Sequence, residues 1–266
     1  MPCRRSFYDA VVLQDILASV RTRLPDVISR EETLRVAASM APVPRSLAGA
    51  LAGGGLSVIA EVKRRSPSKG AIDPSLDPGA LAAAYERGGA AAISVLTEVD
   101  HFGALSGDLA AVRAAVGVPV LRKDFVLHPA QVWEARAMGA DAVLLIAAVL
   151  SDAELAIALD AARESGLDAL VEVHDADEAR RVTALGALIV GVNNRNLQTF
   201  TVDLATAESL RSLLPPGCTT IAESGIATPE AASRMAAAGY DAVLVGEAAV
   251  RHPDPAAFVA SLRGQS

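Results

Sequence analysis

The stretch PAQVWEARAMGADAVLLI, residues 129–146, contains the unit from which the fold of this chain is built. An amphipathic, alanine-rich segment runs from Pro129 to Met138, Gly139 follows it, and the apolar run DAVLLI begins at Asp141. Proline suits the first turn of a helix, and glycine accepts the left-handed geometry in which helices often end. The stretch therefore predicts a helix, a tight turn and a buried strand.

The same order recurs along most of the chain. Glycines stand where a helix is expected to give way to a strand, at Gly55, Gly89, Gly117, Gly139, Gly166, Gly186, Gly217 and Gly239. The apolar runs that follow are SVIAEV from Ser57, AAISVL from Ala91, VPVLRK from Val118, DAVLLI from Asp141, DALVEV from Asp168, ALIVGV from Ala187, TTIAES from Thr219 and DAVLVG from Asp241. Because these runs are nearly continuously apolar, we expect parallel strands that are covered on both faces.

Eight such units in 266 residues predict an α/β protein, a closed (β/α)8 barrel of the TIM type. A doubly wound open sheet is the alternative, but it ordinarily has fewer strands, and no run here is followed by a G-x-G-x-x-G motif. Residues 1–54 stand outside the repeat and predict an N-terminal helical extension, packed on a catalytic barrel of residues 55–266. We expect helices over residues 8–29 and 30–41. The extension either caps one end of the barrel or only covers apolar surface.

Composition limits the classes of function. Hydrophobic residues make up 52% of the chain and aromatic residues 3%, so the core must consist of alanine and branched aliphatic side chains. The formal net charge of -7 argues against a nucleic-acid binder, because phosphate backbones are held by clustered lysine and arginine. The most apolar stretch, residues 142–150, is too short to span a bilayer. We expect no contact with nucleic acid or membrane.

Cysteine and histidine usage indicates a reduced, cytoplasmic protein without a metal site. Cys3 and Cys218 form no disulfide framework, and with four dispersed histidines they give no zinc-binding spacing. The start, MPCRRSFYDAVV, lacks the sustained apolar run of a signal peptide. His101, His128 and His174 fall near loops of the expected active side, but none has a sequence partner that implies a ligand or a triad. We expect at most a minor substrate contact from them.

Polar residues gather where five of the expected strands end, which is where barrels of this type place catalytic groups. They are Glu61, Lys63, Lys123, Glu172, Asn193, Arg195, Glu223 and Ser224. Taken singly, each could be a solvated strand end or half of a neutralising ion pair. Together, lysines, glutamates and an asparagine predict general acid–base chemistry on a carbonyl compound. We expect burial and mutual charge to bring the pKa values of these lysines and glutamates toward neutrality.

Two glycines late in the chain predict a phosphate-binding site. Gly225 and Gly246 follow the seventh and eighth expected strands, whose loops often hold phosphate in such barrels. Glycine lets backbone N–H groups approach an anion closely. The alternative is that both glycines only shape turns.

Read together, the strand ends are IAEVKRRSPSKG, VLRKDF, VEVH, GVNNRNL, AESGI and VLVGE. In this order, across residues 57–250, they closely resemble the indole-3-glycerol-phosphate synthase family of tryptophan biosynthesis, and the first string is the most distinctive. The resemblance implies a substrate, 1-(2-carboxyphenylamino)-1-deoxyribulose 5-phosphate, that loses carbon dioxide and water as it forms indole-3-glycerol phosphate. It also implies that no cofactor is needed.

The resemblance further implies roles for individual residues. Lys123 would be the general acid at the carbonyl, with Glu172 beside it as a proton acceptor or stabiliser of positive charge. Lys63 would hold the anthranilate carboxylate or act as acid in dehydration, and Glu61 would act as base or orient the lysines. Asn193 would fix a substrate hydroxyl. The remaining matches are substrate-pocket positions (Ser66, Phe102, Phe125, Arg195, Glu223, Ser224) and phosphate-binding positions (Gly225, Gly246, Glu247).

Two departures from the family pattern stand out. After the second expected strand the family commonly has Phe-x-Gly-Ser, whereas this chain has Phe102, Gly103, Ala104 and Leu105. After Gly246, where a serine is often found, this chain has Glu247.

This function has two alternatives. A barrel isomerase for a phosphorylated sugar and a non-catalytic, metabolite-binding barrel are the alternatives. We expect a monomer, with a weak homodimer as the alternative.

Overall fold

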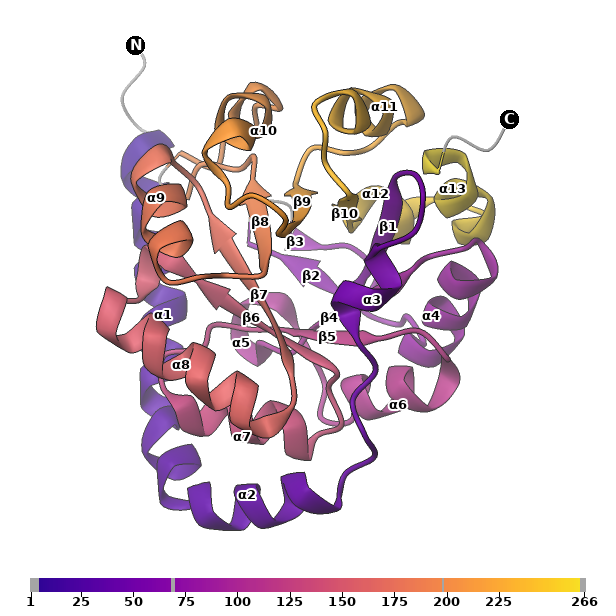
Figure 1. Cartoon of the computed structure of the whole chain (residues 1–266). Coiled ribbons are helices and arrows are strands. Elements are labelled where there is room, and N and C mark those ends of the chain that lie inside the picture. Colours follow the sequence, from indigo (N-terminus) through magenta and orange to yellow (C-terminus); the bar gives the residue numbers. More distant parts are fainter. Residues whose placement is uncertain (1–4, 68–69, 198, 264–266) are drawn as a thin grey trace.

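Eight parallel strands close into a barrel in this computed structural model, which describes residues 5–67, 70–197 and 199–263 (Figure 1). The barrel strands are β1 (Ser57–Val62), β4 (Ala92–Leu96), β5 (Val120–Lys123), β6 (Ala142–Ile146), β7 (Asp168–Val173), β8 (Ile189–Asn193), β9 (Thr219–Glu223) and β10 (Ala242–Val245). Neighbours in the chain pair in parallel, and β1 pairs with both β4 and β10 to close the ring. The predicted (β/α)8 barrel is confirmed.

Helices surround the strands in Figure 1. The longer ones are α4 (Pro78–Arg87), α6 (Asp108–Ala115), α7 (Pro129–Ala137), α8 (Asp152–Ser165), α9 (Ala176–Ala184), α10 (Ala205–Leu210), α11 (Pro229–Ala237) and α13 (Pro255–Leu262). Loops contain the short helices α5 (Val99–Phe102) and α12 (Glu247–Arg251), the 3-10 turns η1 (Ala147–Val149) and η2 (Arg211–Leu213), and the hairpin of β2 (Arg65–Ser66) and β3 (Gly70–Ala71). No described helix is long and apolar enough to cross a membrane.

Local sequence explains where these helices begin. The side chains of Asp77, Ser151, Asp175, Thr228 and Asp254 accept hydrogen bonds from backbone N–H groups in the first turns of α4, α8, α9, α11 and α13. Proline occupies the first turn of three of these five helices, α4, α11 and α13, and also of α7, where its missing N–H leaves no hydrogen bond of the helix unmade.

One expected turn geometry is wrong. Seven of the eight repeat glycines have positive φ, but Gly117 does not. The N–H of Gly117 instead donates a 2.8 Å hydrogen bond to Oε1 of Glu86, and a Cβ atom at Gly117 would lie 3.2 Å from that oxygen. Close approach of a side chain, rather than a left-handed backbone, explains glycine at this position.

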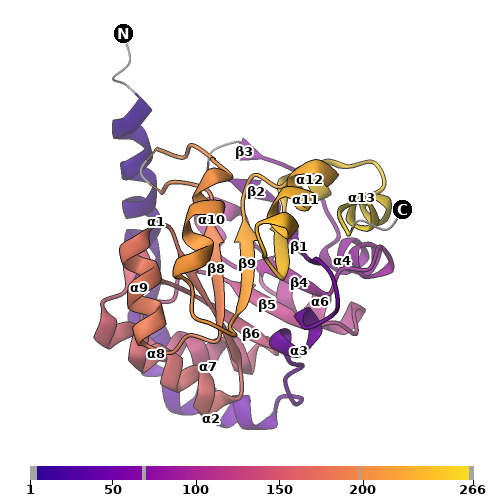
Figure 2. The ribbon, with the colours of Figure 1, turned by 45° about the horizontal axis from the view of Figure 1, so that its top comes forward.

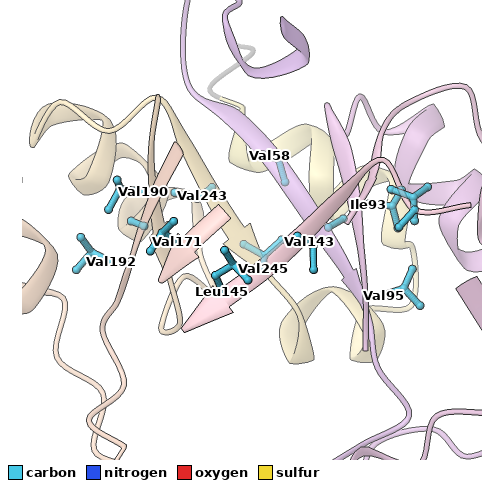
Figure 3. Packing of buried hydrophobic residues seen from close by; sticks show 14 of the residues in the cluster. Val58, Ile93, Val95, Val143, Leu145, Val171, Val190, Val192, Val243 and Val245 are labelled. Carbon is cyan, nitrogen blue, oxygen red and sulfur yellow. The ribbon is translucent and has the colours of Figure 1, made fainter. Parts of the chain in front are cut away.

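Side chains alternate across the strands and build two apolar layers. One layer lies between the strands and the helices and includes Val58, Val143 and Val190, which Figure 3 shows within a cluster of mostly valine side chains. The other includes Ile59, Leu144 and their neighbours on the opposite strand faces, and it fills the barrel interior. The predicted aliphatic core is confirmed, and polar side chains remain for the carboxyl ends of the strands.

The N-terminal segment forms three helices, α1 (Arg5–Ser29), α2 (Glu31–Met40) and α3 (Leu47–Leu51). The first two match the predicted helices closely, whereas α3 was not predicted. Leu47 and Leu51 are fully buried in the interior cluster, so α3 closes the amino-terminal end of the barrel. Figure 2 shows α2 and α3 toward the end of the molecule opposite the β2–β3 hairpin.

The second helix, α2, covers apolar surface of the barrel, which is the other role predicted for the extension. Leu34 and Ala38 of α2 form an apolar cluster with Trp133 of α7. The extension thus both caps the barrel and covers apolar surface.

Candidate active site

A pocket opens at the carboxyl-terminal mouth of the barrel. Its lining includes all but one of the predicted site residues: Glu61, Lys63, Ser66, Phe102, Lys123, Phe125, Glu172, Asn193, Arg195, Glu223, Ser224, Gly246 and Glu247. Gly225 is the predicted residue that is not part of the lining. Ser68 and Lys69 of the RRSPSKG loop lie outside the described residues.

Lys123 lies between two glutamates in the pocket. Its Nζ, at the end of β5, lies 3.2 Å from Oε2 of Glu172 on β7 and 3.4 Å from Oε2 of Glu223 on β9. Burial opposes the charged ammonium, but the carboxylates of Glu172, Glu223 and Glu61 outweigh burial and raise the pKa of Lys123 above its ordinary value. The expected fall of this pKa toward neutrality is wrong, because three strands bring carboxylates around one lysine.

The two glutamates beside Lys123 have unequal partners. Oε1 of Glu172 lies 3.1 Å from Nδ2 of Asn193 and 3.1 Å from Nε2 of His174, in addition to the Lys123 contact at Oε2. Burial disfavours the charge on Glu172, yet Lys123 and His174 outweigh it and lower the pKa of Glu172 below its ordinary value. The prediction that this pKa moves toward neutrality is therefore also wrong.

The pKa of Glu223 moves toward neutrality, as expected. Its Oε1 is buried and has no hydrogen-bond partner among the residues that the structure describes. Burial raises the pKa of Glu223 to about 8, Lys123 opposes this, and the neighbouring carboxylates of Glu172 and Glu61 add to it. The surroundings thus favour the ionised form of Glu172 and the protonated form of Glu223.

Gly191 of β8 makes room for Glu223, and sequence reasoning missed it. A Cβ atom at Gly191 would collide with Oε1 of Glu223 and lie 3.1 Å from Cδ1 of Leu170. The signal in the sequence is a glycine inside an otherwise branched strand, ALIVGV, which often marks a close approach.

Glu61 and Lys63 form an ion pair at the end of β1. Nζ of Lys63 lies 2.8 Å from Oε1 of Glu61. A Cβ atom at Gly246 would lie 2.6 Å from Oε1 of Glu61 and 3.0 Å from Nζ of Lys63, so both charged groups contact the backbone after β10. Glycine at position 246 is required by this approach.

The loops after β1 and β4 are joined by a buried ion pair that sequence reasoning did not single out. Nε and Nη2 of Arg64 donate to the two carboxylate oxygens of Asp108 at 3.1 and 2.9 Å, and Nη1 donates to the carbonyl of Leu76 at 2.7 Å. Asp108 also accepts a 3.0 Å hydrogen bond from the N–H of Leu105. The pair thus fixes the segment that contains Ser66 against the segment that contains Phe102.

The first helix also reaches the pocket. Leu13 and Ile16 of α1 are part of its lining. Arg23 of α1 pairs at 3.1 Å with Glu98, which is fully buried and accepts hydrogen bonds from the first N–H groups of α5. Sequence reasoning missed this because residues 75 positions apart form the contact.

The aromatic side chains lie together. The rings of Phe102, on α5, and Phe125, after β5, have centroids 6.3 Å apart with a tilt of 36°. Arg195 donates from Nη1 to the carbonyl of Phe200, another residue of the lining, at 3.1 Å. The pocket thus combines a charged floor with an apolar and aromatic rim.

The region expected to bind phosphate contains two consecutive residues with left-handed backbone. Ser224 and Gly225 both have positive φ, 63° and 83°. A Cβ atom at Gly225 would lie 2.6 Å from Cγ1 of Val202, so glycine is needed here for packing. The carboxylate of Glu247 pairs with Nε of Arg251 at 3.1 Å. No group of three metal-binding side chains was found within residues 5–67, 70–197 and 199–263.

A buried lysine within 3.4 Å of two glutamates at a barrel mouth is typical of a (β/α)8-barrel enzyme with acid–base groups. The sequence model of one family, described as indole-3-glycerol phosphate synthase, matches residues 13–262. The chain belongs to the indole-3-glycerol phosphate synthase family, a family of carboxy-lyases.

Relatives agree over nearly the whole chain. An indole-3-glycerol phosphate synthase of Parafrankia sp. is 50% identical over 94% of this chain and 94% of its own. Those of Nocardioides sp. and Micrococcus luteus are 51% and 49% identical, over 95% and 96% of this chain and 98% of their own. These relatives do not favour the isomerase or the non-catalytic alternative.

Among solved structures, thiamine phosphate pyrophosphorylase from Pyrococcus furiosus has a TM-score of 0.59 at 18% identity and covers 78% of this chain and 94% of its own. This likeness shows the fold alone.

Proposed function

We propose that this chain converts 1-(2-carboxyphenylamino)-1-deoxyribulose 5-phosphate into indole-3-glycerol phosphate, with loss of carbon dioxide and water. Family membership over almost the full length supports this reaction. The observation that carries it is the position of Lys123, 3.2 Å from Glu172 and 3.4 Å from Glu223 inside one pocket. Ring closure requires a proton at the ketone, and a lysine kept charged by carboxylates supplies one.

The first step is carbon–carbon bond formation. Lys123 donates a proton to the ketone oxygen, so that the carbonyl carbon becomes electrophilic and the anilino ring attacks it. The ring nitrogen gains positive charge as this bond forms, and the ionised Glu172 stabilises that charge or accepts the proton. Asn193, which donates to Glu172, also fixes a hydroxyl of the substrate.

Decarboxylation and dehydration follow. Loss of carbon dioxide restores the aromatic ring, and departure of the hydroxyl as water completes the indole. Lys63 holds the carboxylate or protonates the leaving hydroxyl, and Glu61, 2.8 Å from it, orients it or acts as base. Both lie beside Gly246, so a positive charge also borders the proposed phosphate-binding backbone.

The remaining lining residues bind and orient the substrate. Phe102 and Phe125 pack on the anthranilate ring and hold it against the ketone, where proximity supplies much of the rate gain. Ser66, Arg195, Glu223 and Ser224 contact the substrate, and the backbone at Gly225, Gly246 and Glu247 binds its phosphate. Because the side chain of Glu247 is paired with Arg251, its N–H is the group that faces the phosphate.

We further propose a cytoplasmic monomer that works without a cofactor. The chemistry moves only protons and carbon dioxide, which the charged side chains of the pocket can assist by themselves. The division into an extension of residues 1–54 and a catalytic barrel of residues 55–266 is likewise proposed.

Turnover by the purified chain tests the reaction. Formation of the fluorescent indole product from the substrate is expected without added metal or nucleotide. Lys123→Ala should reduce kcat by roughly a thousandfold or more, since it removes the general acid and its charge together. Arg180→Ala, at an exposed position on α9, is the control and should keep wild-type turnover. Full activity of Lys123→Ala would contradict the proposed function, and binding without turnover by the wild type would favour a metabolite-binding barrel.

A further inference from the structure

His174 occupies an unusual position next to the proposed active site. It follows β7, two residues after Glu172, and its side chain is 10% exposed. Nε2 lies 3.1 Å from Oε1 of Glu172, and Nδ1 lies 3.1 Å from Oε2 of Glu178, in the first turn of α9. The ring therefore lies between two carboxylates, and only one of them belongs to the pocket lining.

Glu178 is itself held in place. The same Oε2 atom that faces Nδ1 accepts a 2.8 Å hydrogen bond from the backbone N–H of His174. The side chain of Glu178 is 12% exposed, and that of Glu172 is 3% exposed. The three groups thus form a chain that runs from α9 inward to the charged floor of the pocket.

Two carboxylates around one imidazole favour its doubly protonated form. A neutral imidazole has a single N–H donor, so one of the two carboxylates would face a lone pair. Burial opposes the charge, but Glu172 and Glu178 outweigh burial and raise the pKa of His174 to about 10. Both ring nitrogens then carry a proton. Nδ1 is within hydrogen-bond geometry of Glu178, whereas Nε2 meets Oε1 of Glu172 as an ion-pair contact outside hydrogen-bond geometry.

Two partners, His174 and Asn193, distinguish Glu172 from Glu223. Glu172 is faced by Lys123 from β5, by the neutral amide of Asn193 from β8 and by His174. Glu223 shares Lys123 and has an Oε1 atom without a partner in the described part of the chain. Glu61 from β1 acts on Lys123 and Glu223 at longer range.

We propose that His174, held as an imidazolium by Glu178, is a positioning residue that keeps Glu172 as the ionised member of the glutamate pair and leaves Glu223 as the member that holds a proton. The inference rests on the proposed function, because it assigns charge states to groups of that reaction. His174 acts through Glu172 and does not touch the substrate.

The pH dependence of turnover tests this assignment. His174→Gln keeps a side chain that can donate a hydrogen bond but removes the charge, so the pKa of Glu172 should rise. The acidic limb of the kcat profile should then move to higher pH by about one unit, with the largest fall in kcat on that limb, little change in kcat at neutral pH, and a smaller change in KM. Glu178→Gln should shift the limb in the same direction by less.

A matched control separates this effect from general damage to α9. Asp177→Asn changes an exposed carboxylate one residue before Glu178, in the same helix, and should leave the kcat profile unchanged. A folded His174→Gln variant whose acidic limb coincides with that of the wild type would overturn the proposal, even if its kcat were lower.

A second measurement needs neither turnover nor a stable variant at position 174. Nitrogen-15 NMR of the histidine rings in the full chain should show one histidine with both nitrogens protonated at about pH 7.5. Substituting His101, His128 and His252 in turn should leave that signal in place. A singly protonated ring for the remaining histidine would overturn the inference. Failure of the wild type to turn over substrate, with this signal present, would count against the proposed function alone.

Discussion

Glu223 shows how one residue can store a proton inside the site. Its raised pKa means that the folded chain binds this proton more tightly than the unfolded chain does between about pH 4.5, the ordinary value, and about pH 8. The folded state therefore holds more protons over that range, and its stability falls as pH rises through it. Glu172 has the opposite sign, because its lowered pKa stabilises the folded state above the ordinary value.

Replacing Glu223 by glutamine should remove the loss of stability that accompanies its ionisation as pH rises. Glu223→Gln removes a group that must ionise in a buried place, so its Tm relative to wild type should rise by several degrees between about pH 5 and about pH 9. Differential scanning calorimetry at both pH values measures the change. Glu208→Gln, an exposed glutamate on α10 paired with Arg234, is the control and should show little such rise. A Tm difference that is the same at both pH values would contradict the raised pKa.

At the scale of elements, the loops around the mouth are held by side chains rather than by strand pairing. The Arg64–Asp108 pair joins the loops after β1 and β4, and Glu98 joins the start of α5 to α1 through Arg23. Both acidic residues also accept backbone N–H groups, so each loop is tied to its anchor by several bonds. The positions of Ser66 and Phe102 depend on these anchors.

Breaking the Arg64–Asp108 pair should free the loop after β1. Arg64→Met leaves Asp108 buried without its cation, which should cost about 3–5 kcal/mol of stability. Limited proteolysis should then cut within residues 64–76 faster than in wild type, and KM should rise. Arg65→Met changes the neighbouring exposed arginine and should preserve wild-type cleavage. Equal cleavage rates in the two variants would contradict the anchoring role.

Helix α3 forms a plug that closes the amino-terminal end of the barrel. Leu51 is 1% exposed within the interior cluster, so Leu51→Ala should lower the free energy of unfolding by about 2–5 kcal/mol. Because α3 lies at the amino-terminal end of the barrel, KM should stay close to wild type. Urea unfolding with a parallel activity assay measures both quantities. Met40→Ala, at a position that is 82% exposed, serves as comparison, and a similar loss of stability there would argue against the plug.

At the scale of the whole molecule, two proposals can be checked together. Light scattering should give a mass near the 27.3 kDa of one chain, and a value near twice that mass would favour the homodimer. Turnover should persist in EDTA, because acid–base side chains supply the chemistry. Loss of activity in EDTA that returns with one added metal would show that a metal takes part.

The barrel itself could be predicted because its signals are local. A glycine, an apolar run and a helix repeat within about 30 residues, and continuously apolar runs are typical of strands buried on both faces. Gly117 departs from this pattern because Glu86, which precedes it by 31 positions, occupies the space that a side chain would need. The helix α3 escaped prediction because five residues between prolines and glycines give no periodicity.

The number and order of the strands, and the charged residues at their ends, follow from the order of residues alone, because periodicity and turn-forming residues act between neighbours in the chain. Which glutamate favours the ionised form depends instead on how the folded chain brings distant groups together. That charge depends on Lys123, 49 positions from Glu172, and on a histidine ring whose second partner lies on a helix. A pKa is set by distance and burial in space, and neither can be read from the order of residues.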